Sequence, residues 1–439
     1  MPGPERFRRL TLEAQSAGRL PSLAAAVFVG GELVWSDAVG LADAEEQAEA
    51  TPDTQYAVAS ITKTFTAASV LQLRDEEKLD LDEPLSRYLP GVAHGSPTLR
   101  RMLAHASGLQ REPPGEVWET LAFPAEEELL GRLGEAEQVL APGAAWHYSN
   151  LAYALLGHVV ARVSGAPFRD YVQERLLAPL GLTRTTWGPV APTAKPYFVE
   201  PYSDAVRREP ELELGGKGGE SGLSSTVGDL AHWGSFLADP DEAVLAPASV
   251  AEMHELQIMA EPDWTLGWGL GIELWRRGER IFSGHTGGFP GFLSVLAYSR
   301  RDRVGAVVLT NSGRWPKLSE TGLALAEAAL EELAPEPEPW APEEPPPEEI
   351  VPLLGRWWSE GDETIFSWRH GKLEARLATA PPEREPSVFE PEGDDRFRTV
   401  SGRERGEVLR VVRDEAGAVA KLYWATYPFT RTPELFGAC

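Results

Sequence analysis

The chain has 439 residues, of which 42% are hydrophobic and 25% charged, a composition typical of a globular protein with room for more than one domain. Its formal net charge of −26 disfavours a nucleic-acid partner and an anionic membrane surface. The single cysteine, Cys439, excludes disulfides within the chain and metal sites built from cysteine.

No run of residues approaches the roughly 20 apolar positions of a membrane-spanning helix. Residues 1–6 contain no apolar core of a secretion signal. We therefore expect a cytoplasmic protein with no membrane partner.

The first elements predicted along the chain are a helix and a β-hairpin. Residues 5–20 have the apolar spacing of an amphipathic helix. Residues 23–29 and 32–40 are β-rich runs on either side of Gly30-Gly31, a strong signal for a two-residue turn. The polar residues 41–53 predict a loop.

The next predicted element is a helix that starts near Ala57 and is apolar almost all round, as core helices are. Ser60 and Lys63 lie three residues apart and therefore share one face of this helix. A serine hydroxyl needs a base within hydrogen-bonding distance to act as a nucleophile. A lysine removed from water can be that base, because burial favours its neutral form. The alternative is a chance pair on a solvated helix, against which the apolar flanks argue.

The middle of the chain predicts a helical region. Residues 80–180 read mostly as helices broken by proline and glycine, the strongest of them at 151–163 and 168–177. Residues 186–220 are irregular and rich in proline and glycine, so we expect them to form part of the rim of a cleft. Residues 229–237 predict another helix.

From residue 266 the hydrophobic period changes to two. Antiparallel strands followed by one long helix are predicted at 268–275, 280–285, 292–299, 304–310 and 318–333. Since strands come from both ends of residues 1–334, we expect a mixed α/β (α+β) domain in which an antiparallel sheet is flanked by helices and carries an inserted all-helical region.

Two further segments follow this domain. Residues 335–349 are rich in proline and glutamate and predict a stiff acidic linker. Residues 350–439 read as short strands separated by turns, which indicates a small all-β barrel or sandwich.

A second candidate motif is Tyr148-Ser149-Asn150, the only Tyr-x-Asn in the chain. A tyrosine beside a lysine ammonium loses its proton more easily and can relay a proton from Ser60. The Asn150 amide can hold a substrate amide by hydrogen bonds. The alternative is a helix cap at Ser149 or Asn150 with a core tyrosine before it.

A third candidate motif is the glycine-rich segment 283–291. Glycine lets another backbone approach closely, so a substrate can pair with this segment as an added strand. The N–H groups of Gly288 and Ser60 can form an oxyanion hole. The alternative is a glycine-rich strand end with a structural histidine, His285.

Together these motifs resemble those of the serine β-lactamase and penicillin-binding-protein superfamily. The resemblance is strongest to the class C β-lactamase-like branch, with its D-aminopeptidases, carboxylesterases and related peptidases. The family's Ser-x-x-Lys, Tyr-x-Asn and Lys/His-Thr/Ser-Gly motifs match Ser60–Lys63, Tyr148–Asn150 and His285–Gly287, in the family's order. The resemblance covers roughly residues 5–333, and residues 350–439 resemble the lipocalin-like barrels of some members more weakly.

The resemblance implies acyl-enzyme chemistry, with no cofactor and no metal. Ser60 attacks a carbonyl, Lys63 and Tyr148 move the proton, and the backbone N–H groups of Ser60 and Gly288 hold the oxyanion. The implied substrate-binding residues are Asn150, His285, Thr286 and Gly287.

One departure from the family concerns His285, because penicillinases and DD-peptidases usually carry a lysine there that recognises a substrate carboxylate. Histidine is mostly neutral at pH 7. This difference weakens the case for β-lactams and C-terminal carboxylates as substrates.

The expected function is therefore a serine hydrolase of small esters, short peptides or amides. A β-lactamase, a D-amino-acid-specific carboxypeptidase or aminopeptidase, and a non-catalytic penicillin-binding sensor stay open as alternatives. The sequence also leaves open whether the protein forms a homo-oligomer.

Overall fold

The computed structural model describes residues 3–121, 123–210, 219, 221–332, 341–342, 344–381 and 384–435. The chain divides into two compact units, Met1–Ala334 and Pro335–Cys439. Part of the predicted linker, at residues 335–340 and 343, lies outside the described residues.

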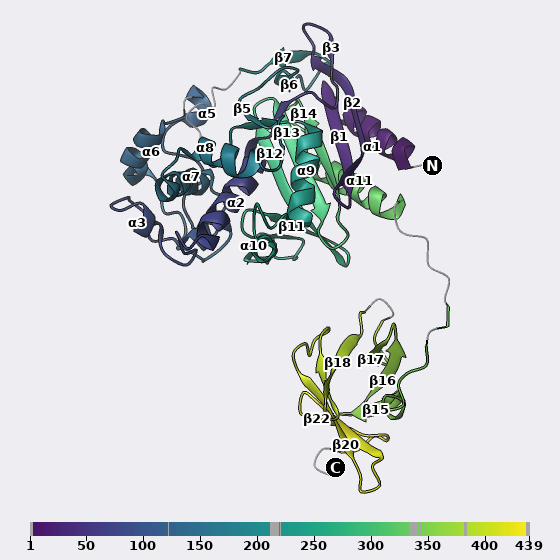
Figure 1. Ribbon diagram of the computed structural model, residues 1–439. Coiled ribbons are helices and arrows are strands. Elements are labelled where there is room, and N and C mark those ends of the chain that lie inside the picture. Colours follow the sequence, from purple (N-terminus) through teal and green to yellow (C-terminus); the bar gives the residue numbers. More distant parts are fainter. Residues whose placement is uncertain are drawn as a thin grey trace. The chain divides into compact units, whose positions relative to one another are not determined.

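The first unit is built on a nine-stranded sheet of order β3-β2-β1-β14-β13-β12-β11-β10-β9 (Figure 1). All neighbouring strands in it are antiparallel. Strands from the two ends of the unit meet at its centre, where β1 pairs with β14 from Leu23↔Thr310 to Val29↔Val304. The bounds are β1 Ser22–Val29, β2 Glu32–Asp43, β3 Ala48–Glu49, β9 Ile258–Met259, β10 Leu266–Trp268, β11 Glu273–Arg277, β12 Arg280–Phe289, β13 Phe292–Ser299 and β14 Val304–Thr310.

Both faces of this sheet are covered by helices. Successive residues of a strand point to opposite faces, so the apolar run of β1 serves two cores. Its odd-numbered residues from Leu23 to Val27 join the core that includes α1 (Gly3–Gly18) and α11 (Leu318–Glu332). Its even-numbered residues from Ala24 to Phe28 join the larger core under α2 (Thr62–Asp75), α7 (Asn150–Ser164) and α9 (Val227–Ala238). The predicted mixed α/β domain is confirmed.

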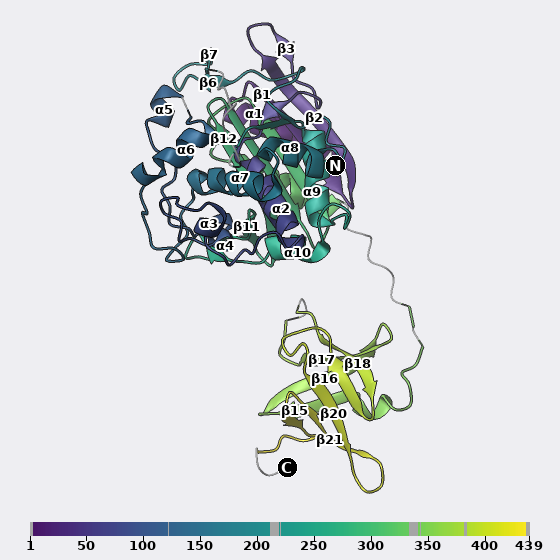
Figure 2. The ribbon, with the colours of Figure 1, turned by 60° about the vertical axis from the view of Figure 1, so that its left-hand side comes forward.

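The inserted helical region lies together at one side of the sheet, where Figures 1 and 2 both show α3, α5, α6 and α7. Its helices are α3 Leu85–Tyr88, α4 Leu99–Leu103, α5 Val117–Thr120, α6 Glu126–Arg132, α7 Asn150–Ser164 and α8 Phe168–Val172, the last continued by a π-helical turn over Gln173–Leu177. Helix α7 ends at Ser164 and is capped by Gly165, whose φ of 76° suits a glycine cap. In the described part of the chain no single helix has the length and apolarity to cross a membrane, and only the bent pair Asn150–Ser164 with Phe168–Leu177 meets that test when its two helices are combined.

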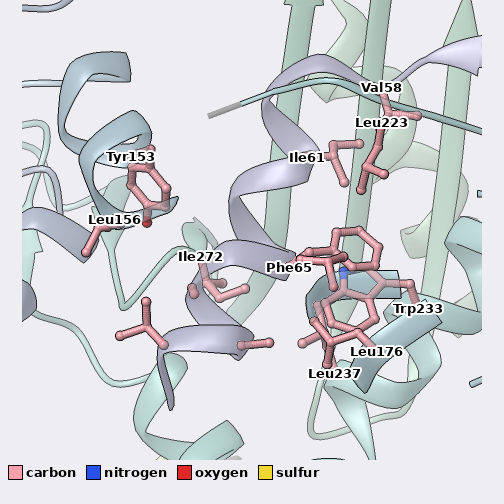
Figure 3. Close-up of a cluster of buried hydrophobic side chains, with 14 of the residues drawn as sticks. Val58, Ile61, Phe65, Tyr153, Leu156, Leu176, Leu223, Trp233, Leu237 and Ile272 are labelled. Carbon is pink, nitrogen blue, oxygen red and sulfur yellow. The ribbon is translucent and has the colours of Figure 1, made fainter. Parts of the chain in front are cut away.

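Helix α2 (Thr62–Asp75) lies between the sheet and the helical region, and every residue from Thr62 to Leu73 is buried. On one side Phe65 stacks on Trp233 of α9 (Val227–Ala238), with ring centres 3.9 Å apart (Figure 3). On the other side Figure 3 shows Tyr153 and Leu156 of α7. The predicted core helix is confirmed, and its packing on all sides fixes the start of the helix in place.

Several local predictions were wrong. The predicted strand 268–275 is two strands, because residues 269–272 leave the sheet to pack against α2. At this break Gly271 has a φ of 76°, and a Cβ on it would lie 2.4 Å from the Cβ of Ala67. Strand β12 continues past residue 285 to Phe289, and β2 continues through Asp43 into the predicted loop, where it pairs with β3.

The remaining short elements surround the main sheet. They are α10 Pro247–Met253, a three-stranded sheet of β4 Tyr56–Ala57, β8 Leu223–Ser225 and β5 Thr186–Trp187, and a hairpin of β6 Tyr197–Val199 and β7 Val206–Arg208. Of the segment 186–220 that was predicted to be irregular, residues 211–218 and 220 lie outside the described residues.

The second unit is one antiparallel sheet of eight strands in sequence order, β15 to β22. The sheet nearly closes on itself, since the N–H of Trp358 donates to the Thr430 carbonyl at 2.9 Å and the N–H of Thr430 donates to the Trp358 carbonyl at 3.0 Å. The predicted small barrel is confirmed, and its shape fits a lipocalin-like domain. The strands are β15 Gly355–Ser359, β16 Asp362–Arg369, β17 Lys372–Leu377, β18 Ser387–Gly393, β19 Arg396–Thr399, β20 Val408–Arg413, β21 Val419–Trp424 and β22 Tyr427–Phe429.

Candidate active site

Ser60 lies on a single 3₁₀ turn, Ala59–Ile61, that leads directly into α2. The residue before it, Ala59, has a φ of 47°, a left-handed conformation that is uncommon for a residue other than glycine. One turn later, the Nζ of the fully buried Lys63 donates to the Ser60 Oγ at 3.0 Å. The structure therefore brings the amine and the hydroxyl of the first motif into direct contact.

Tyr148 of the second motif lies close to the same hydroxyl, near enough for Ser60 to influence the pKa of its phenol. The Nζ of Lys63 lies 5.2 Å from the centre of the Tyr148 ring. Burial raises the pKa of the Tyr148 phenol above its ordinary value, more than the nearby Ser60 hydroxyl lowers it. The phenol is therefore protonated at neutral pH, and the expected easy loss of its proton is not found.

A stack of rings holds Tyr148 in place. The His105 ring lies parallel to it at 4.1 Å between centres, and Trp268 meets it edge-on at 5.8 Å. His105 is anchored in turn, because its Nδ1 accepts the Ser149 N–H at 3.1 Å. Burial holds the pKa of His105 well below its usual range, so the ring is neutral. His105 and Trp268 were not predicted as site residues, because neither belongs to one of the three motifs.

Asn150 starts α7, and Ser149 caps that helix by accepting the Ala152 N–H at 3.0 Å. The capping alternative is thus correct for Ser149 and coexists with the site. The Nδ2 of Asn150 donates to the Glu112 Oε1 at 2.8 Å, while its Oδ1 is buried with no hydrogen-bond partner among the described residues. Asn150 therefore offers a substrate an acceptor, while one of its two N–H donors is already used.

The third motif lies along an open edge of β12. Along a strand, the backbone N–H and C=O groups of successive residues point alternately to the two neighbouring strands. Phe289 and Phe292 flank the two-residue turn between β12 and β13, so the backbone groups of the odd-numbered residues of β12 point toward β13. The even-numbered Thr286 and Gly288 therefore face the other side. Strand β11 covers that side only as far as Glu273↔Gly284. Within the described residues no strand pairs beyond it, so the Gly288 N–H faces open space.

Gly287 brings this edge against the turn that carries Ser60. A Cβ on Gly287 would lie 2.2 Å from the Val58 carbonyl oxygen and 3.2 Å from the Ser60 nitrogen. Only a residue without a side chain fits there. The contact places the neighbouring Gly288 beside Ser60, as an oxyanion hole made of their two N–H groups requires.

The edge of β12 was expected to be free to pair with a substrate strand, but at Thr286 it is not free. The Thr286 N–H donates to the Glu273 Oε1 at 3.2 Å, and the His285 Nδ1 donates to the Thr286 carbonyl. Both backbone groups of Thr286 are thus already bonded within the protein, so the first free edge position is Gly288. Burial, together with the nearby Lys63 charge, lowers the pKa of His285 to about 3, so this side chain is neutral at pH 7, as predicted.

Glu273 belongs to none of the three motifs and was not predicted as a site residue. It lies against this edge with only 6% of its surface exposed. Its Oε1 also accepts the Thr286 Oγ1–H at 2.7 Å and lies 3.6 Å from the His285 Nδ1. Burial raises the pKa of its carboxyl to about 7, although the hydrogen bonds from Thr286 and the Lys63 charge work in the opposite direction. The only sequence signal for it was a lone acidic residue in an otherwise apolar run.

A family model described as "Beta-lactamase" matches residues 7–331. The chain belongs to the beta-lactamase family. A second family, described as "Domain of unknown function (DUF7586)", matches residues 346–431, which cover the barrel.

Curated relatives of this beta-lactamase family member are distant. "Beta-lactamase-like protein 2" of Dictyostelium discoideum is 27% identical over 306 residues, which cover 65% of this chain and 55% of that protein. The "D-alanyl-D-alanine-carboxypeptidase/endopeptidase AmpH" of Escherichia coli (strain K12) is 28% identical over 281 residues, which cover 59% of this chain and 72% of the relative. The chain thus spans only about half the length of the first of these relatives.

Solved structures share the fold of this beta-lactamase family member. The octameric penicillin-binding protein homologue from Pyrococcus abyssi has a TM-score of 0.67 and 22% identity, covering 97% of this chain and 99% of its own. D-amino acid amidase from Ochrobactrum anthropi SV3, complexed with L-phenylalanine, has a TM-score of 0.67 and 23% identity over 75% of this chain and 98% of its own. A D-stereospecific amidohydrolase from a Streptomyces species has a TM-score of 0.63 and 26% identity over 72% of this chain and 98% of its own.

Beside Gly288 the beta-lactamase-like unit has a pocket of about 680 Å³. Its lining includes four aromatic side chains, those of Trp118, Tyr197, Phe198 and Phe289, together with the charged side chains of Glu119, Glu209 and Arg314. Tyr197, Phe198 and Pro210 belong to the segment 186–220, which was predicted to form part of the rim of a cleft. No group of three or more His, Cys, Asp or Glu side chains suited to a metal ion occurs in the described ranges.

Proposed function

We propose that this member of the beta-lactamase family is a serine hydrolase that forms an acyl-enzyme on Ser60 and cleaves small amides, short peptides or esters. The observation that carries the proposal is the hydrogen bond that the Lys63 Nζ donates to the Ser60 Oγ at 3.0 Å, with the Tyr148 ring centre 5.2 Å from the same Nζ. A serine held between an amine and a phenol has a route for its proton.

The proposed reaction has two halves. In the first, the Ser60 Oγ attacks the substrate carbonyl carbon and its proton passes to a neutral Lys63 amine. The protonated Tyr148 phenol gives its proton to the leaving group and regains one from the Lys63 ammonium. The N–H groups of Ser60 and Gly288 hold the oxyanion. In the second half a water molecule gives up its proton along the same route and releases the acyl group.

The substrate class is inferred from the charges around this edge. His285 is neutral and the Glu273 carboxyl lies beside it, so among the described residues the edge holds no cation where the family's lysine would receive a carboxylate. Amide cleavage is supported by the names of the amidase, amidohydrolase and carboxypeptidase relatives. We propose uncharged acyl compounds whose side group enters the aromatic pocket.

The decisive test compares Ser60→Ala with Ser86→Ala, a control at an exposed serine of α3. We expect Ser60→Ala to abolish turnover of p-nitrophenyl acetate and of amino-acid amides, and Ser86→Ala to leave it unchanged. Intact-mass spectra should show a transient acyl adduct on the wild type only. Turnover by Ser60→Ala, or an adduct that persists without turnover, would contradict a hydrolase.

We also propose a homo-oligomer. The octameric homologue from Pyrococcus abyssi matches 97% of this chain and supports this proposal. Light scattering coupled to size-exclusion chromatography tests it, and a monomer at micromolar concentration would refute it.

A further inference from the structure

The free edge of β12 is held at one point by a buried carboxyl. Glu273 receives two hydrogen bonds from the same residue, the Thr286 N–H at 3.2 Å and the Thr286 Oγ1–H at 2.7 Å. These bonds occur where β11 has stopped pairing with β12. The Glu273 side chain therefore takes the place that the next residue of β11 would occupy in the ladder.

The segment that Glu273 holds pairs with β13 on one side only, because β11 no longer covers its other side. Gly287 and Gly288 follow Thr286, and two consecutive glycines have more conformational freedom than any other pair of residues. On its other side this segment touches the Ser60 turn through Gly287. Thr286 is thus the last residue with a side-chain anchor before the Gly288 N–H.

A buried carboxyl at this position is energetically unfavourable. Burial of a carboxyl with few partners costs free energy that an apolar residue would avoid. Lys63 of α2, Tyr148 before α7 and His285 of β12 all interact with it electrostatically or by proximity. None of these is a close ion pair that would explain the charge, whereas the two bonds to Thr286 are direct.

We propose that Glu273 is a positioning residue, which clamps Thr286 at the free edge of β12 and thereby keeps the Gly288 N–H aimed at the oxyanion beside Ser60. This inference rests on the proposed function. Glu273 acts through Thr286 and does not touch the substrate. Its loss should therefore lower kcat and leave KM nearly unchanged.

The experiment uses the full chain and three variants. Glu273→Ala removes the clamp, Glu273→Gln keeps an oxygen that accepts both hydrogen bonds, and Glu279→Gln is a control at an exposed turn of the same hairpin. We expect Glu273→Ala to lower kcat for p-nitrophenyl acetate by about 10- to 100-fold, less than or equal to the loss of an oxyanion donor. Glu273→Gln should stay within about threefold of the wild type, and the control should not change.

A double-mutant cycle guards against a purely structural effect. Thr286→Val removes the hydroxyl contact, so adding it to Glu273→Ala should cost nothing further if both changes break one clamp. Melting temperatures of all variants show which are folded. If Glu273→Ala does not fold, Thr286→Val alone must still lower kcat and leave KM unchanged.

Two outcomes overturn the inference. One is wild-type kcat in folded Glu273→Ala or Thr286→Val, and the other is a Glu273→Gln variant as impaired as Glu273→Ala. The proposed function is tested independently, because turnover by Ser60→Ala would contradict it whatever the Glu273 variants show. An inactive Ser60→Ala together with a fully active Glu273→Ala removes only the role of Glu273.

Discussion

At the Ser60 hydroxyl, two proton-carrying groups approach from different parts of the chain. Lys63 lies on α2, one turn after Ser60, and its position beside the hydroxyl follows from the three-residue spacing in the sequence. Tyr148 comes from a segment 88 positions away, and the neutral His105 ring stacks on its ring and holds it close to Ser60. Burial keeps the phenol protonated, which suits it to give a proton to a leaving group.

Replacing Tyr148 with phenylalanine tests this role. The variant keeps the ring stacked on His105 and removes only the hydroxyl. We expect kcat to fall about 100-fold or more, the usual contribution of a general acid, with little change in melting temperature. The fully exposed Tyr202 provides the matched control as Tyr202→Phe. A Tyr148→Phe variant as active as this control would remove the phenol from the mechanism.

At the scale of elements, the free edge of β12 decides what the site can bind. Thr286 is closed to added strands by Glu273 and His285, while Gly287 presses the edge against the Ser60 turn. The three candidate motifs and most helices were predictable from the sequence, because each depends on residues close together in the chain. Glu273, Glu112 and the break at 269–272 were not, because each depends on contacts between segments that only the folded chain brings together.

Gly287→Ala should disable the site by geometry alone. The added methyl would lie 2.2 Å from both the Val58 oxygen and the Ser294 Oγ, so β12 must move away from Ser60. We expect kcat to fall more than about tenfold and stability to drop by roughly 1–3 kcal/mol, as for other overpacked sites. Gly131→Ala is the control, since nothing lies within 4 Å of a Cβ there. Kinetics and urea denaturation measure both, and an unperturbed Gly287→Ala would contradict the close contact.

The charges at this edge predict a preference between matched esters. Above pH 7 the Glu273 carboxyl is ionised and His285 is neutral, so phenyl acetate should be hydrolysed faster than 3-acetoxybenzoate, its carboxylate counterpart. We expect at least a fivefold difference in kcat/KM at pH 8, which shrinks in Glu273→Gln. Faster turnover of the anionic ester would point instead to Arg111, whose guanidinium lies 4.9 Å from the Tyr148 ring centre.

At the scale of the whole molecule, buried neutral groups govern the response to acid. Burial lowers the pKa of His254 to about 4 and of His285 to about 3, and it holds the pKa of His105 well below its usual range. Each of these side chains takes up a proton near pH 6.5 only when the protein unfolds. Glu273 acts in the opposite sense, because its pKa of about 7 lies above the unfolded value of about 4.5.

Stability should therefore decline as the pH falls from about 6.5 to 4.5. In this range the unfolded chain gains three protons at the histidines, while the folded chain retains one at Glu273 that the unfolded chain lacks. The net difference of two protons gives a loss of at most roughly 3 kcal/mol per pH unit. Urea denaturation at several pH values measures the slope, which should be steeper in Glu273→Gln. A flat profile over this range would contradict the neutral buried histidines.

The closed position at Thr286 also matters for the design of covalent probes. A strand-mimicking peptidyl warhead would find its first pairing groups occupied, and an anionic one would be repelled by the charge of the nearby Glu273 carboxyl. A compact, uncharged electrophile with an aryl arm directed toward Trp118 and Phe198 matches what the pocket leaves available. Labelling reagents of that shape should therefore tag this protein more readily than penicillin-like ones.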